Sequence, residues 1–123
     1  YALRQLLRPG VTIGISGDAY AGLGLNAGCE VWYSVCGGLF PEMAKQITEA
    51  AAANDRQRVT ALTTRLEPLW SLFRKHRGSI RVIAAAAGVL GLTDMDCLPR
   101  PLQPLSAGDI ADIAHVISTL ELK

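Results

Sequence analysis

The stretch Val11-Thr12-Ile13-Gly14-Ile15-Ser16-Gly17-Asp18 decides how the rest of the chain is interpreted. Its first five residues are mostly β-branched and do not alternate strictly with polar residues, which is typical of a strand covered on both faces. A short helix is predicted at residues 19–26, and a second strand at residues 30–35. Two parallel strands cannot bury both faces and both edges alone. Either partner strands come from a missing N-terminal part or from another chain, in which case the sequence begins inside a domain, or the fold is unusual.

Only helices follow the second strand. Pro41 and Glu42 suit the first turn of a helix, Asp55 is a good N-cap for the next, and Pro68 is expected to kink or divide that long helix. An apolar stripe at helical spacing runs along each of these segments. The remaining predicted segments are a helical tail at residues 1–8, a helix at 78–90, a proline-rich loop at 93–105 and a helix at 106–120.

The composition excludes several classes of protein. Of the 123 residues, 50% are hydrophobic and 19% are charged, and the net charge is +1, so nothing indicates nucleic acid or an anionic membrane as a partner. No apolar run reaches the roughly 18 residues of a membrane span, and no signal peptide is recognisable. The cysteines, Cys29, Cys36 and Cys97, fit no metal or redox spacing. We therefore expect buried, reduced thiols in a cytoplasmic protein.

The candidate binding residues follow the two strands. In α/β folds, ligands bind at the carboxyl ends of the strands. Ser16, Gly17 and Asp18 follow the first strand, and they are interpreted either as a substrate-binding turn or as a simple turn in which Asp18 caps the helix at 19–26. Trp32 and Tyr33 are adjacent in the second strand, so their side chains are expected on opposite faces, one of them in the core. The following Cys36-Gly37-Gly38 is expected to break that strand and to form the loop before the next helix.

Several stretches, in this order and spacing, resemble the dihydrodipicolinate synthase / N-acetylneuraminate lyase family. They are Ile15-Ser16-Gly17-Asp18 after a strand, Gly28 before Val31-Trp32-Tyr33-Ser34-Val35, Phe40-Pro41-Glu42-Met43 at a helix start, Arg65-Leu66-Glu67-Pro68-Leu69 with Phe73, and Leu90-Gly91-Leu92 before Arg100-Pro101-Leu102-Gln103-Pro104-Leu105. None of these motifs is specific alone, but together they cover almost all of the chain.

The resemblance implies an α/β fold, the C-terminal portion of a (β/α)8 TIM barrel. Residues 1–54 would hold the last β/α units, with strands like the family's seventh and eighth, and residues 55–123 would form the C-terminal helical extension. It also implies a class I lyase or synthase that forms a lysine Schiff base with pyruvate or another 2-oxo acid and makes or breaks a C–C bond with an aldehyde. Such enzymes need no cofactor and no metal, and the family's members are commonly homotetramers.

The resemblance places the nucleophilic lysine and the proton-relay tyrosine upstream of this sequence, so no catalytic residue is expected in it. Ser16, Gly17, Asp18, Trp32 and Tyr33 would bind substrate, and the backbone at Trp32 matches a position that touches the pyruvate moiety. Bulky residues at 32 and 33 depart from the family, as does the stretch Gly78-Ser79-Ile80-Arg81-Val82, where many synthases have an N-P-[IL]-P-like sequence. Both departures favour a 2-oxo acid reaction other than that of lysine biosynthesis.

The chain's own lysines do not resemble a Schiff-base nucleophile, which must be desolvated or lie beside another cation in a pocket. Lys45 falls on the polar side of its helix, Lys75 lies in a charged helix end, and Lys123 is the last residue. His76 and His115 have no ligand-like companions and are expected on the surface. The alternative interpretation is therefore a catalytically silent fragment that acts as a packing or oligomerisation module.

Overall fold

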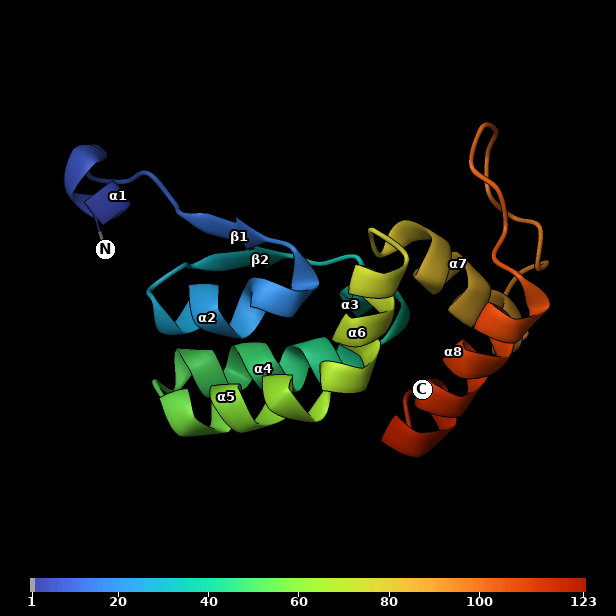
Figure 1. Cartoon of the computed structure of the whole chain (residues 1–123). Coiled ribbons are helices and arrows are strands. Elements are labelled where there is room, and N and C mark those ends of the chain that lie inside the picture. The colour runs from blue at the N-terminus through green and yellow to red at the C-terminus, as the bar shows by residue number, and fades with distance from the viewer. Residues whose placement is uncertain (1) are drawn as a thin grey trace.

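A computed structural model describes residues 2–123 and shows two parallel strands covered on one side by helices (Figure 1). The order of elements is α1 (Ala2–Leu6), β1 (Gly14–Ser16), the 3-10 helix η1 (Asp18–Tyr20), α2 (Ala21–Asn26), β2 (Val31–Tyr33), α3 (Cys36–Leu39), α4 (Pro41–Ala52), α5 (Arg56–Arg65), α6 (Glu67–Lys75), α7 (Ile80–Val89) and α8 (Ala107–Leu120). Tyr1, part of the predicted helical tail, lies outside the described residues.

The sheet consists of β1 and β2 in parallel, with Gly14 opposite Val31, Ile15 opposite Trp32 and Ser16 opposite Tyr33. Helix α2 covers one face, and the α4–α5 pair lies on the other side of α2 (Figure 1). The opposite face of the sheet is bare in the described chain. This arrangement of sheet, helix and helical layer is that of a partial α/β barrel, as the sequence predicted.

One hydrophobic core joins helices α3 to α8. Phe40, Ile47, Val59, Trp70 and Ile113 are all at most 2% exposed, although they come from segments far apart in the sequence. The Trp70 indole N–H donates to a backbone carbonyl at 2.9 Å, so this large side chain is buried without an unsatisfied polar atom. The core includes residues from both predicted parts of the chain, and the boundary predicted at residue 54 falls in the turn between α4 and α5.

The helix boundaries follow the capping signals in the sequence. The Asp55 carboxylate accepts a hydrogen bond from Arg58 N at 3.0 Å at the start of α5, and the Ser106 hydroxyl accepts one from Asp109 N at 3.2 Å at the start of α8. The predicted division near Pro68 is confirmed, because α5 ends at residue 65 and α6 begins at residue 67. The proline-rich segment between α7 and α8 contains no helix or strand.

Three local predictions are wrong. Both strands are shorter than predicted, because only three residues of each are paired in a regular ladder. Before this ladder, a single backbone hydrogen bond, from Glu30 N to Ile13 O at 2.8 Å, still joins the two segments. Gly37-Gly38 do not form a loop but lie within the helical turn α3, whose first amide groups have an acceptor described below. Of the cysteines, all free, only Cys36 is buried; Cys97 is exposed in the proline-rich segment.

None of the described helices is long and apolar enough to span a membrane.

Candidate functional site

The predicted site residues meet at one edge of the sheet. Ser16 and Tyr33 are register partners at the last paired position of the two strands, and Gly17 and Asp18 follow directly in the turn to η1. Gly17 has φ +90°, a conformation that other residues rarely adopt, so this sharp turn at the end of β1 depends on glycine. The structure therefore brings all five residues together at the carboxyl ends of the strands.

Asp18 has a different partner from the predicted one. Its side chain is 5% exposed and does not cap the helix that follows it. Instead Oδ1 accepts from Trp32 Nε1 at 3.1 Å and from Val35 N at 3.3 Å, and Oδ2 accepts from Cys36 N at 2.9 Å. The carboxylate thus supplies acceptors for the first amide groups of α3 and ties the end of β1 to the end of β2. The prediction that it caps residues 19–26 is wrong, because its oxygens accept from residues 32, 35 and 36 instead.

Trp32 and Tyr33 lie on opposite faces, as the strand geometry predicted. Trp32 is partly buried on the helix side, where it packs against the core and donates to Asp18. Tyr33 is 66% exposed on the bare face, together with Ser16. The two aromatic residues consequently have different roles: the indole fixes the strand ends, whereas the phenol remains accessible to a ligand.

The buried thiol at this edge is not a nucleophile at neutral pH. Burial raises the pKa of Cys36 to about 12, and the nearby Asp18 carboxylate adds to the rise, against the effect of a hydrogen bond with the Ser34 hydroxyl. Ser34 Oγ lies 3.4 Å from the sulfur and accepts from Gly37 N at 2.7 Å. A thiol held neutral in this way packs and does not react.

Two further residues lie at this edge that were not predicted from the sequence. Tyr20 is 61% exposed, and a Cβ at Gly17 would lie 3.4 Å from its ring, so the phenol stands beside the turn. Gly14 lies under the ring of Tyr33 on the bare face. A signal existed for Gly14, because an isolated glycine in a β-branched strand often marks the close approach of another group. No sequence signal distinguished Tyr20.

Two of the three lysines, Lys45 and Lys75, are paired with acids. Lys75 Nζ lies 2.8 Å from Asp109 Oδ1 and 3.1 Å from Asp112 Oδ2, and these hydrogen bonds, that of Asp109 first, raise the pKa of the lysine. A raised pKa is the opposite of what an amine nucleophile requires. Lys45 pairs with Glu49 at 3.5 Å on the surface.

The prediction of surface histidines holds for His115 and is wrong for His76. His115 is exposed on α8. The His76 side chain is only 8% exposed, and its buried Nε2 lies 3.6 Å from Asp109 Oδ1 without a hydrogen bond. The start of α8 covers this ring, which the local sequence of α6 does not show. Among residues 2–123, no group of three or more His, Cys, Asp or Glu side chains is arranged to hold a metal ion.

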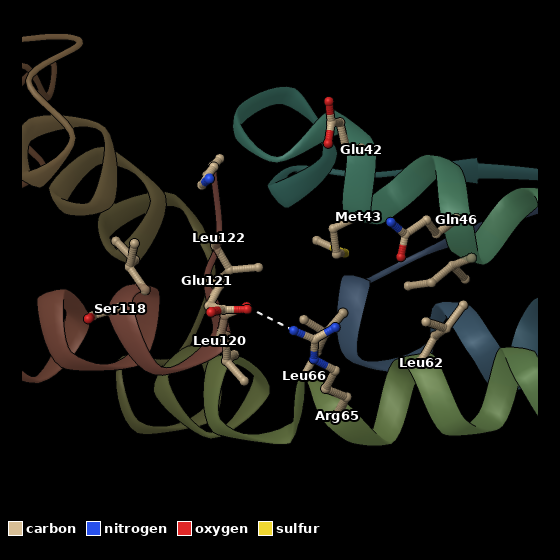
Figure 2. A pocket seen from close by; sticks show the side chains of 13 residues that line it. Glu42, Met43, Gln46, Leu62, Arg65, Leu66, Ser118, Leu120, Glu121 and Leu122 are labelled. Carbon is tan, nitrogen blue, oxygen red and sulfur yellow. Dashed lines mark hydrogen bonds between the residues drawn. The ribbon is translucent and has the colours of Figure 1, made fainter.

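A pocket of about 600 Å³ lies elsewhere, between α4, α5 and the end of α8. Figure 2 shows Met43, Leu62 and Leu66 along its sides and Arg65, which donates to the Leu120 carbonyl at 3.2 Å. None of the five predicted binding residues lines it. Its size suits a small ligand, but its polar groups include no arrangement of nucleophile and base. The chemistry-bearing side chains therefore remain those at the strand ends.

Comparison with known proteins gives the fold independently. No protein-family model and no curated protein matches the chain. The solved structure of a dihydrodipicolinate synthase from Agrobacterium tumefaciens matches 97% of the chain with 39% identity and a TM-score of 0.89. The synthase from Thermotoga maritima matches 99% with 18% identity and a TM-score of 0.88, and a chloride-inhibited synthase from Acinetobacter baumannii complexed with pyruvate matches 99% with 20% identity and a TM-score of 0.85.

The chain spans only 39%, 41% and 41% of the length of these three proteins. Each synthase matches nearly all of this chain, but this chain matches only part of each synthase. This pattern is expected for a chain that corresponds to one portion of a larger barrel. The resemblance to the dihydrodipicolinate synthase / N-acetylneuraminate lyase family is thus confirmed, and the chain has the fold of about two fifths of such a synthase, consistent with its C-terminal part.

Proposed function

We propose that this chain is the C-terminal part of a class I lyase or synthase that forms a Schiff base with pyruvate or another 2-oxo acid. The observation that supports this most strongly is the 39% identity to a dihydrodipicolinate synthase over 97% of the chain. A second support is the binding of pyruvate by the Acinetobacter baumannii synthase, whose fold this chain shares over 99% of its length.

In the proposed reaction, a lysine amine adds to the 2-oxo carbon, and loss of water gives an iminium ion. Loss of a proton from the neighbouring carbon gives an enamine. That carbon then bonds to the carbon of an aldehyde, whose oxygen takes up a proton, and water hydrolyses the iminium to release product and lysine. Cleavage follows the same steps in reverse. We assign the lysine to a strand outside this chain, since Lys45 and Lys75 are exposed and ion-paired.

This chain would supply one wall of the active site. Ser16 and Tyr33 would meet substrate on the bare face of the sheet, and the Gly17 turn would leave the strand end open. Asp18 and Trp32 would position these residues from the helix side of the sheet, by holding the two strand ends together. We further propose that residues 1–54 complete the barrel, that residues 55–123 form its helical extension, and that the enzyme is a cytoplasmic homotetramer that needs no cofactor.

The proposal is tested on the natural polypeptide that contains this sequence. The protein is incubated with pyruvate, reduced with borohydride and weighed intact by mass spectrometry. We expect a gain equal to one reduced pyruvate per chain, and none when borohydride or pyruvate is omitted. Absence of the adduct under conditions that label a known class I aldolase would reject the lyase and leave the alternative, a packing or oligomerisation module.

A further inference from the structure

The ring of Tyr33 occupies the space that a side chain at Gly14 would take. A Cβ built at Gly14 would lie 2.6 Å from Cε2 and 3.2 Å from Cδ2 of Tyr33, and 3.0 Å from Cγ1 of Val31. The first of these distances is shorter than any real carbon contact of this kind. The two residues are therefore matched: the phenol can lie in this position only because β1 has no side chain there.

The glycine is not required by the backbone. Gly14 is absent from the residues with positive φ, unlike Gly17 in the following turn. Any amino acid could adopt its extended conformation within β1. The reason for a glycine at this position is consequently the room that it leaves for the Tyr33 ring.

The strand register fixes where the ring lies. Tyr33 is opposite Ser16, whereas Gly14 is two residues nearer the start of β1 and opposite Val31. The ring therefore leans diagonally across β1, away from the carboxyl ends, and covers the bare face just beneath the candidate site. It is 66% exposed, and within residues 2–123 its hydroxyl makes no hydrogen bond, so both the ring and the hydroxyl can meet a ligand.

We infer that Tyr33, seated on Gly14, forms the floor of the substrate site and limits the length of the aldehyde that can lie there. This inference rests on the proposed function and deepens it by assigning the residue that selects the second substrate. The Tyr33 ring makes the site shallower, because it fills the space beneath the strand ends that a longer aldehyde would need. Short aldehydes fit above the ring, and longer ones meet it.

Three single variants and one double variant of the natural polypeptide test the inference, with propanal and hexanal as aldehydes and pyruvate as the first substrate. Tyr33→Ser removes the ring, and we expect kcat/KM for hexanal relative to propanal to rise roughly 10- to 200-fold, the range that added methylene groups give in an apolar pocket. The change should be mainly in KM for hexanal. Tyr33→Phe keeps the ring and should leave the ratio within about twofold of its original value, since length and not the hydroxyl is being selected.

Gly14→Ala supplies the coupling test. The new Cβ displaces the ring away from β1 into the site, so the hexanal-to-propanal ratio should fall further when Tyr33 is present. In the Tyr33→Ser background, the same Gly14→Ala change should have no effect on the ratio. Additive effects of the two changes, or an unchanged ratio in Tyr33→Ser, would overturn the inference.

The pyruvate adduct separates this inference from the proposed function. Each variant is also trapped with pyruvate and borohydride, and the aldehyde ratio is compared among the proteins that form the adduct. If the unchanged protein forms no adduct, the proposed function fails and this inference fails with it. If the adduct forms in every variant but the aldehyde ratio does not respond to Tyr33, or neither aldehyde is consumed, only the assignment of Tyr33 is overturned.

Discussion

Asp18→Ala should destabilise the fold more than any other single change at the strand ends. The carboxylate is 5% exposed and accepts three hydrogen bonds, from Trp32 Nε1, Val35 N and Cys36 N. Truncation leaves all three donors without their acceptor, and each buried unsatisfied donor costs about 1–3 kcal/mol. Because the losses share one site and water can reach part of it, we expect roughly 3–5 kcal/mol in total.

A milder substitution sharpens this prediction. Asp18→Asn keeps an oxygen for two of the donors but places an NH₂ group against Cys36 N–H, so a loss of about 2 kcal/mol is expected. The control is Asp96→Asn in the exposed proline-rich segment, which should change stability by less than about 0.5 kcal/mol. Urea unfolding of the natural polypeptide, followed by tryptophan fluorescence and circular dichroism, measures all three. A loss below about 1 kcal/mol for Asp18→Ala, or equal losses for Ala and Asn, would refute the network as described.

Three further predictions concern the thiols, the acid cluster and the core. At pH 8, iodoacetamide should modify the exposed Cys97 quickly and leave Cys36 unmodified until urea is added, because burial raises the pKa of Cys36 to about 12. The extent of labelling at each cysteine is measured by mass spectrometry of the peptides. Labelling of both cysteines at the same rate would contradict this prediction. The pKa of Asp109 is lowered from 3.8 to about 2, chiefly by its hydrogen bond with Lys75. The contribution of the Asp109 carboxylate to stability is therefore complete above about pH 4 and is lost as the pH falls toward 2. Lys75→Gln should move the pKa of Asp109, measured by NMR titration of its carboxyl group, back toward 3.8. An unchanged pKa would contradict the pairing of Asp109 with Lys75. Trp70→Phe should cost about 1–2 kcal/mol and Trp70→Ala about 3–5 kcal/mol in urea unfolding, because only the second removes the buried ring; equal costs would contradict the packing.

The helical part of the fold was predictable because its signals are local. An N-cap carboxylate at Asp55, a serine at Ser106 and a proline at Pro68 each act within a few residues of their own position. The period of two in a strand likewise predicted that Trp32 and Tyr33 face opposite ways. Which of the two faces the helices could not be predicted, because that depends on where α2 lies relative to β2.

The details of the site depended on contacts between distant segments. The Asp18 carboxylate could accept from the amides of the residues that follow it or from those at the start of α3. Only the folded chain shows that it accepts from the amide of residue 36. His76 belongs to a charged stretch that resembles a surface, yet the start of α8 buries its ring. The reason for a glycine at position 14 is evident only from the folded chain, in which the ring of Tyr33 lies over it. In each case the deciding partner lies at least 17 residues away.

The central claim is that this chain is one part of a barrel whose Schiff-base lysine lies in another part. It is tested most directly by mapping the borohydride-reduced pyruvate adduct in the natural polypeptide to a single residue by tandem mass spectrometry of its peptides. The account predicts one modified lysine, in a peptide outside this 123-residue chain. An adduct on Lys45, Lys75 or Lys123, or no adduct on any peptide, would contradict it.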